Sequence, residues 1–275
     1  MSYDPRCTRF PYTELTDGHY LTVKKDDGTV FDEHYPYIDR SRRSNFIRAA
    51  ARLLLVAIVF PLTRVKLGLR VVGRDKIRKN KELFTKGVIS CANHVALWDY
   101  LAIGCAIRPF KPHVLVWAPN IRGENGPLMR AVGGIPIPEN DVRATAACMQ
   151  QCRRMLDEGG WLHIYPEGSM WEYYAPIRPF KPGIGYFACQ CDKPVLPMGF
   201  SYRKPSVIRE KLFHQPACFT LTIGEPIFAD ASLPLKEREE DLIRRCHAAV
   251  CRLAGIAPEE NRYAPIYDHS RRIDD

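Results

Sequence analysis

The residues with the clearest capacity for chemistry are His94 and Asp99, in the run Asn93-His94-Val95-Ala96-Leu97-Trp98-Asp99. On one continuous helix this spacing would turn the aspartate about 140° away from the histidine, because each residue turns about 100°. The side chains meet if His94 lies in a loop after a strand and Asp99 lies in the first turn of the next helix. This arrangement favours a general base oriented by a carboxylate. The alternative is a structural hydrogen bond.

A second run, Tyr165-Pro166-Glu167-Gly168-Ser169, directly follows a predicted strand. A proline and a glycine on either side of a glutamate are typical of a tight turn. Such a turn presents a carboxylate, a hydroxyl and backbone N–H groups together, so we predict that it receives an alcohol or a phosphate. An unremarkable surface turn is the alternative.

Short β-rich segments alternate with helical patterns and would position both runs. Predicted strands cover 88–92, 114–118, 161–165, 195–200 and 218–224, and predicted helices cover 97–107, 142–157, 184–191 and 236–254. This alternation predicts an α/β fold with helices covering the sheet. Each run follows a strand, and open α/β sheets place their sites at the carboxyl ends of strands.

The 275 residues are long enough for a full core, and 46% apolar with 26% charged residues excludes disorder for most of the chain. We predict four parts. They are an N-terminal appendage at 1–40, a basic amphipathic membrane-docking helix region at 41–68, a catalytic domain at 69–255, and a C-terminal tail at 256–275.

The net charge of +9 is concentrated in residues 35–90, which hold 14 Lys and Arg against three Asp and Glu. There Arg48 and Arg52 precede a ten-residue apolar run, 53–62, of about 15 Å as helix against a hydrocarbon core of about 30 Å. We predict an interfacial helix that stops at Pro61, cannot cross a bilayer, and uses the arginines as a collar for anionic headgroups. A core helix with a solvated first turn is the alternative. Without a zinc-finger, RNP-type or basic-zipper pattern, nucleic acid is an unlikely partner.

The cysteines and the first residues indicate a cytoplasmic setting. Ten cysteines lack a CxxC or paired metal spacing, which favours free thiols over disulfides or a metal site. Residues 1–11 are polar and of mixed charge, unlike a signal peptide. Cys91 is disfavoured as a nucleophile because strand alternation buries it. We therefore expect the cytoplasmic side of the cell membrane.

Two further blocks complete a pattern: Gly134-Ile135 between the two runs, and Val195-Leu196-Pro197-Met198 after them. In this order the four blocks, over roughly residues 53–224, resemble the glycerolipid acyltransferase family of the bacterial lysophosphatidate acyltransferase type. Its signatures are Asn-His-x4-Asp, Gly-x-Ile/Phe, Pro-Glu-Gly-Thr/Ser and hydrophobic-Pro-hydrophobic.

The resemblance implies a mixed β-sheet flanked by helices, with an N-terminal interfacial helical element. It also implies transfer of a fatty acyl group from acyl-CoA or acyl carrier protein to the hydroxyl of a lysophosphatidate-like acceptor, with no further cofactor. His94 would be the base and Asp99 its orienting carboxylate. The implied substrate-binding residues are Asn93, Gly134, Ile135, Glu167, Gly168 and Ser169.

The chain departs from the family where two arginines are associated with the acceptor phosphate. Pro138-Glu139-Asn140 stands at the first position and Met170-Trp171 follows Ser169 at the second. We predict Arg178 and Lys181 as replacement cations, with Arg122 and Arg143 as alternatives and a solvated basic loop as the plain explanation.

The departure leaves other functions open. One is the same transfer to another acceptor, such as a lysophospholipid or a different alcohol. Another is a non-catalytic protein that binds anionic membranes or nucleic acid. A hydrolase is disfavoured because the chain has no Gly-x-Ser-x-Gly elbow.

Overall fold

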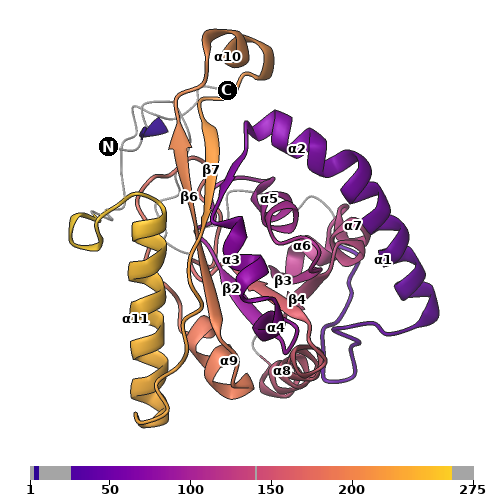
Figure 1. The fold of residues 1–275 in the computed structure, drawn as a ribbon. Coiled ribbons are helices and arrows are strands. Elements are labelled where there is room, and N and C mark those ends of the chain that lie inside the picture. The colour runs from indigo at the N-terminus through magenta and orange to yellow at the C-terminus, as the bar shows by residue number, and fades with distance from the viewer. Residues whose placement is uncertain (1–2, 6–25, 140, 262–275) are drawn as a thin grey trace.

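The computed structural model describes residues 3–5, 26–139 and 141–261, and a seven-stranded sheet forms its centre (Figure 1). The strand order is β1-β7-β6-β2-β5-β3-β4, and every neighbouring pair is parallel except β6 and β7. The strands are β1 (Arg70–Val72), β2 (Val88–Cys91), β3 (Pro112–Trp117), β4 (Gly134–Ile137), β5 (Trp161–Ile164), β6 (Val195–Arg203) and β7 (Cys218–Ile223). The fold class, α/β with a mixed sheet, is therefore confirmed.

Helices cover both faces of this sheet (Figure 1). One side carries α8 (Val142–Asp157), α9 (Gly183–Cys191) and α11 (Leu235–Leu253). The other carries α2 (Phe60–Leu67), α3 (Arg74–Lys79), α4 (Lys81–Phe84) and α5 (Asp99–Ala106). The remaining elements are α1 (Arg42–Leu54), a π-helical turn η2 (Leu55–Val59), α6 (Ala118–Arg122), α7 (Gly126–Ala131), α10 (Val207–Phe213) and a 3-10 turn η3 (Pro258–Glu260).

Side-chain alternation in the central strands supplies a core to each layer. In β5, Leu162 and Ile164 pack with α8, α9 and α11, whereas Trp161 packs with Phe84 and α5 on the other side. Because successive side chains of a strand point to opposite faces, the side chains of His163 and Tyr165 point to the α5 side, as that of Trp161 does. The polar residues near the site therefore share a face with α5.

The helix through Pro61 corrects a sequence prediction. Elements α1, η2 and α2 form one unbroken helical stretch, Arg42–Leu67, of 26 residues. Proline has no N–H to bond four residues back, and η2 precedes it with the Phe60 N–H bonded to the Leu55 carbonyl, five residues back. The π turn thus accommodates Pro61, and the helix ends at Gly68 in the left-handed conformation.

This length overturns the argument that the segment is too short to cross a membrane. Among the described residues, Arg42–Leu67 is the one helix long and apolar enough to span a bilayer by length and composition. Its length of about 39 Å exceeds a hydrocarbon core of about 30 Å. However, Phe60, Thr63 and Leu67 are buried against the domain, so one side of the helix is packed on protein.

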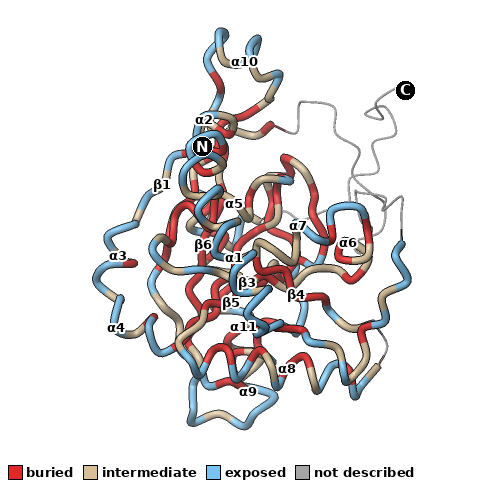
Figure 2. The backbone as a smooth tube through the Cα atoms, turned by 90° about the vertical axis from the view of Figure 1, so that its right-hand side faces the viewer, coloured by how far each residue is buried: buried red, intermediate tan, exposed pale blue. Residues whose placement is uncertain are grey.

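The outward side of the same helix is apolar. Figure 2 shows α1 running across the front of the domain with mostly exposed and intermediate residues. Large apolar side chains recur there at helical spacing and are more than half exposed: Phe46, Leu53, Leu54, Ile58, Leu62 and Val65. No residue of α1 is buried, so the core-helix alternative is wrong.

Arg48 and Arg52 do not form the predicted outward collar. Arg48 donates to the Asp39 carbonyl (2.7 Å), and Arg52 donates to the carbonyls of Pro109 (2.9 Å) and Phe110 (3.0 Å). Both arginines lie on the helix side that faces the protein. The physical reason is the helical period, which places them opposite the exposed apolar residues.

The two ends of the chain are described only in part. Of the predicted appendage 1–40, residues 1–2 and 6–25 lie outside the described residues, while Phe31, Tyr37 and Ile38 contribute to the core beside α8. Of the predicted tail 256–275, the structure describes residues up to Asn261.

Candidate active site

Strand register brings the two sequence runs together. Strands β2 and β5 pair in parallel with Cys91 opposite Ile164. His94 lies three residues after the end of β2, and Glu167 lies three residues after the end of β5. The two loops therefore meet at one edge of the sheet, and the backbone N–H of His94 donates to Glu167 Oε2 at 3.2 Å.

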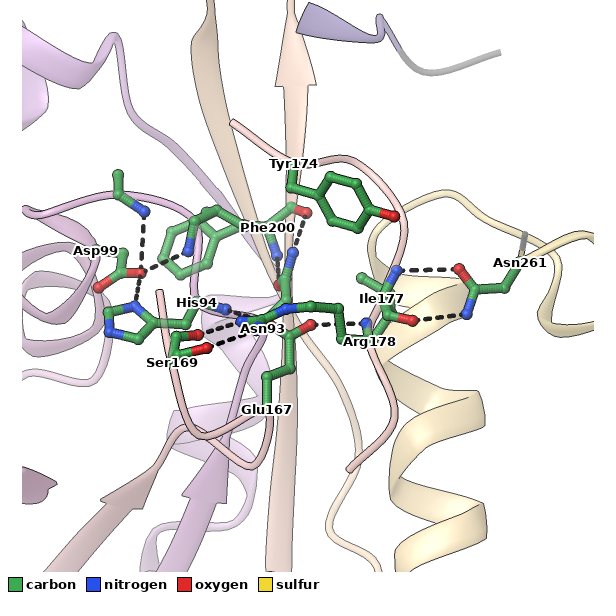
Figure 3. A network of polar contacts seen from close by, with 12 residues as sticks. Asn93, His94, Asp99, Glu167, Ser169, Tyr174, Ile177, Arg178, Phe200 and Asn261 are labelled. Atoms are coloured by element: carbon green, nitrogen blue, oxygen red, sulfur yellow. Dashed lines mark hydrogen bonds and ion pairs between the residues drawn. The ribbon is translucent and has the colours of Figure 1, made fainter. Parts of the chain in front are cut away.

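The predicted contact between His94 and Asp99 is present (Figure 3). His94 Nδ1 lies 2.7 Å from Asp99 Oδ2. The carboxylate is fixed by its place in the first turn of α5, and its Oδ2 also accepts the N–H groups of Val95 (3.0 Å) and Ala96 (3.3 Å). The histidine side chain is 24% exposed and the aspartate side chain 1%. The ring is thus held from within the protein and remains partly accessible.

The surroundings of Asp99 keep it ionised. Burial alone would raise the pKa of this carboxyl, but the charge and hydrogen bond of His94 and the donors from Tyr165 and Val95 outweigh it and lower the pKa. An ionised carboxylate at Nδ1 leaves Nε2 as the basic atom of the ring. It also stabilises the imidazolium that forms when Nε2 takes a proton.

Tyr165 supports both members of the pair. Its hydroxyl donates to Asp99 Oδ1 at 2.7 Å, and its ring stacks on the His94 ring with centroids 3.9 Å apart and planes 13° apart. Sequence reasoning gave Tyr165 no role. The signal was present in the strand alternation, which places it on the same face as His163.

Glu167 and Arg178 form a second buried pair beside the first (Figure 3). Arg178 Nη2 lies 3.0 Å from Glu167 Oε2, and the two side chains are 2% and 3% exposed. Arg178 also donates to Ser169 Oγ (2.7 Å) and to the Ser169 carbonyl. Its guanidinium stacks over Trp171 at 4.7 Å. Arg178 is therefore not a residue of a solvated loop, and its guanidinium holds the Glu167 turn together, which is a different task from the predicted one.

Asn93 is buried in a structural contact. Its amide donates to the Phe200 carbonyl (3.1 Å), and its carbonyl oxygen accepts the Phe200 N–H (2.8 Å). This two-point contact ties the loop after β2 to the neighbouring strand β6. Asn93 thus acts on the site by placing the backbone of His94.

Gly168 and Lys181 lie together at the outer side of the turn. Gly168 adopts a φ of +82°, and a Cβ atom there would lie 2.8 Å from Lys181 Nζ. Any side chain at this position would therefore meet both backbone strain and the lysine. The Gly168 N–H donates to the Tyr165 carbonyl (3.1 Å), which removes it as a candidate donor to a reacting oxygen. Lys181 is an exposed residue at this turn.

Gly134 and Ile135 lie farther from the pair. Both belong to β4, three strands away from β2 in the sheet order, and both are buried. Gly134 pairs with Val114, and Ile135 packs in the core. The structure therefore does not bring them into contact with His94. The alternative cations Arg122 and Arg143 lie beside Glu139 and Glu33, respectively.

Sequence reasoning also missed a group near Asp99 at the end of α2. Lys66 Nζ lies 4.2 Å from the centre of the Trp98 ring. Burial, together with the charge of Asp99, raises the pKa of Glu172, and Lys66 opposes the rise. Lys66 therefore places a cation, and Glu172 a carboxyl with a raised pKa, within electrostatic range of Asp99.

Cysteine chemistry does not fit this site. Cys91 is fully buried in the core beneath α11, and its pKa is raised by a hydrogen bond with Cys246 and by burial. A thiol that stays protonated is a poor nucleophile. Among residues 3–5, 26–139 and 141–261, no group of three or more His, Cys, Asp or Glu is arranged to hold a metal ion.

The geometry defines a class of site. A partly exposed imidazole, fixed by a buried carboxylate at the carboxyl edge of a parallel sheet, can take a proton from a hydroxyl. Residues 68–201 match the family model described as Acyltransferase.

Two individual proteins are similar to the chain. A 1-acyl-sn-glycerol-3-phosphate acyltransferase of Chlamydomonas reinhardtii is 26% identical over 193 residues, which are 69% of this chain and 53% of that protein. The match thus spans about half the length of that curated relative. The crystal structure of the 1-acyl-sn-glycerophosphate (LPA) acyltransferase PlsC from Thermotoga maritima aligns with 76% of this chain and 83% of its own, at 19% identity and a TM-score of 0.43.

Proposed function

We propose that the protein is a membrane-associated O-acyltransferase that moves a fatty acyl group from acyl-CoA or acyl carrier protein to a lysophosphatidate-like acceptor. Such a reaction forms phosphatidic acid in phospholipid biosynthesis. The observation that carries the proposal is the 2.7 Å contact between His94 Nδ1 and Asp99, held beside the Glu167 turn. The family match supports acyl transfer, and the similarity to the algal 1-acyl-sn-glycerol-3-phosphate acyltransferase supports the acceptor class.

The proposed mechanism needs only the chain and its two substrates. His94 Nε2 takes the proton of the acceptor hydroxyl as its oxygen attacks the thioester carbonyl carbon. The tetrahedral intermediate then breaks its C–S bond, and the thiolate receives the proton from the imidazolium. Because the thioester is already activated, no covalent enzyme intermediate and no further cofactor are required.

We propose that α1 and α2 lie in the membrane surface on the cytoplasmic side. The exposed apolar side chains from Phe46 to Val65 would enter the lipid, while the buried Phe60 and Leu67 keep the opposite side on the domain. A helix packed on protein along one side is better suited to lie in the interface than to cross it. The thioester and the acceptor would then meet at the same surface.

A second candidate has the same chemistry with another acceptor, such as a lysophospholipid or another alcohol. The observation that favours it is the burial of Arg178 on Glu167 and Ser169, which leaves Lys181 as the exposed cation of the turn. A phosphate monoester is usually held by several donors, often arginine. An acceptor without a terminal phosphate would need fewer.

A panel of acceptors tests the proposal and separates the two candidates. Labelled acyl-CoA and acyl carrier protein are offered to the wild type with glycerol 3-phosphate, lysophosphatidate, a lysophospholipid and an uncharged alcohol. We expect transfer to lysophosphatidate to be the fastest. His94→Ala should lower transfer by about 10³- to 10⁴-fold while thermal unfolding stays nearly unchanged.

The control is His247→Ala, which alters a histidine that packs on Phe180, outside the dyad. It should retain transfer. Faster transfer to the uncharged alcohol would support the second candidate. Full transfer by His94→Ala would refute the base assignment. Absence of transfer with every pair of substrates would favour a non-catalytic membrane-binding protein.

A further inference from the structure

A cavity of about 270 Å³ lies between the inner side of α1 and the domain. Its walls come from α1, from Tyr100 and Leu101 of α5, and from the residues at the starts of β3 and β4, including Lys111 and His113. His94 is not among the lining residues. The cavity lies at the amino ends of β3 and β4, whereas His94 and Glu167 lie beyond the carboxyl ends of β2 and β5.

The cavity carries positive charge with no carboxylate in its lining. Arg48, Arg52 and Lys111 line it, and none of the lining residues is Asp or Glu. In the described part of the chain, Arg48 and Arg52 donate hydrogen bonds to neutral oxygens, and no ion pair involves either arginine or Lys111. Burial lowers the pKa of Arg52, because the guanidinium has lost part of its water.

His113 adds an unsatisfied polar atom. Its Nδ1 is buried and has no hydrogen-bond partner within the described residues. Burial, with the charges of Arg48 and Arg40, lowers the pKa of His113 to about 4, so the ring is neutral and one of its nitrogens carries a proton. An unpaired buried donor or acceptor is costly unless a ligand or water pairs with it.

The lining also includes apolar side chains, among them Leu55, Phe60 and Val132. An anion with an adjoining hydrocarbon part therefore fits better than a small ion alone. The cavity adjoins the helix whose outward side is exposed and apolar, and headgroup phosphates lie at the depth of such an interfacial helix.

We propose that this cavity binds the phosphate of an anionic diacyl phospholipid of the membrane, at a site separate from the acceptor hydroxyl. The proposal rests on the proposed function to the extent that α1 lies on lipid. Arg48, Arg52 and Lys111 would hold the phosphate oxygens, with His113 beside them. The apolar wall would receive the first part of an acyl chain.

Binding of soluble short-chain lipids tests the site without a membrane. The probes are short-chain phosphatidylserine, which has no hydroxyl to acylate, and phosphatidylcholine of the same chain length, titrated below micelle formation. Both lipids carry the phosphate, but the quaternary ammonium of phosphatidylcholine makes that lipid neutral, whereas phosphatidylserine keeps a net negative charge beside Arg48, Arg52 and Lys111. We therefore expect the wild type to bind phosphatidylserine at least about tenfold more tightly than phosphatidylcholine. Arg52→Gln with Lys111→Gln should remove this preference.

Arg42→Gln with Arg43→Gln is the matched control. Both arginines are exposed on the first turn of the same helix and do not line the cavity. The control removes the same charge and should keep the preference. If the double cavity variant is unfolded, Lys111→Gln alone carries the test, because this lysine is exposed and its substitution should disturb the fold little. It should weaken phosphatidylserine binding by about fivefold.

Three results would overturn the proposal: no preference in the wild type, a preference that survives both cavity substitutions, or equal binding of inorganic phosphate, which would make this a free-phosphate site. Acyl transfer by the wild type is measured separately in detergent. Its absence would refute the proposed function and leave the binding result intact. Transfer without a phosphatidylserine preference would refute the cavity site alone.

Discussion

Asp99 and Glu167 are two buried carboxylates at the same edge of the sheet, and each contacts one basic side chain. Asp99 is 1% exposed and Glu167 4%. Asp99 binds an imidazole that is 24% exposed, whereas Glu167 binds a guanidinium that is 2% exposed. The two pairs therefore differ in the chemistry and the accessibility of their basic side chains.

This difference assigns proton transfer to the His94–Asp99 pair and structural support of the site to the Glu167–Arg178 pair. An imidazole changes its charge near neutral pH, and a partly exposed one can exchange a proton with a bound hydroxyl. A guanidinium keeps its proton under all ordinary conditions. The Glu167–Arg178 pair is thus a fixed charge pair that shapes the turn and holds the His94 backbone. Motif residues at the same edge have separate tasks, and the partner of each carboxylate indicates which.

The largest expected effect is on catalysis, from Asp99→Asn. An amide can still contact Nδ1, but it carries no charge to stabilise the imidazolium. We expect kcat to fall by about 10³- to 10⁴-fold. The thermal midpoint should change little by comparison, because the amide oxygen can still accept the N–H groups of Val95 and Ala96. Steady-state transfer assays and thermal unfolding of the same preparation measure both.

Retention of more than a tenth of the wild-type kcat would show that Asp99 has only a structural task. Asp241→Asn is the control, because that aspartate pairs with Arg244 and Arg245 on α11, outside the site. It should leave kcat unchanged.

Glu167→Gln should affect stability more than chemistry. The substitution leaves the Arg178 charge buried without a carboxylate, and breaking a buried pair in this way costs about 3–5 kcal/mol. For a domain of this size the thermal midpoint should fall by roughly 6–20 °C. Differential scanning calorimetry measures the change, and transfer at a low temperature measures the residual activity.

Glu158→Gln is the matched control, since Glu158 forms an exposed pair with Arg40 at 2.7 Å. Exposed pairs contribute little, so its midpoint should stay at the wild-type value. Two results would refute the separate roles of the Glu167–Arg178 and His94–Asp99 pairs. One is an unchanged thermal midpoint in Glu167→Gln, and the other is a fall in its kcat as large as that in Asp99→Asn.

Elements with a clear local pattern were predictable from the sequence, including the four-residue strands β2 and β5, and elements without one were not. The bounds of α8 agree with the predicted 142–157, since the Asp141 side chain accepts the N–H groups of Arg143 and Ala144 at the start of the helix. Strand β4 has four residues with Pro136 inside it, so it lacks a local pattern. The extension of the helix past Pro61 depends on a π turn, which residue types alone do not reveal.

The same limit applies to the site. The contact between His94 and Asp99 was predictable because it spans five residues around a strand end. The contacts of Arg178 with Glu167 and Ser169 depend on the path of the intervening loop, which no periodicity determines. The surroundings of Arg48 and Arg52 likewise come from distant segments, at Asp39 and Pro109.

The smallest expected effect is from Tyr165→Phe, which removes one hydrogen bond and keeps the ring stack. The lost hydroxyl donates to Asp99 and lowers the pKa of its carboxyl. Without it, more negative charge is available to His94, and the imidazolium becomes more stable relative to the neutral ring. Because the neutral ring is the base, the acid limb of the pH–rate profile should move to higher pH, by about half a unit.

The direction of this shift tests whether Asp99 sets the charge of His94. A variant whose site is merely less ordered would have a lower kcat, but the acid limb of its pH–rate profile would not move to higher pH. Tyr202→Phe removes another buried hydroxyl bond, to the Tyr174 carbonyl at 3.1 Å, and should leave the limb in place. An unchanged limb in Tyr165→Phe would mean that the tyrosine only packs on the ring. A limb at lower pH would mean that its hydroxyl strengthens the base, and Asp99 would then not be the acceptor that sets the charge of His94.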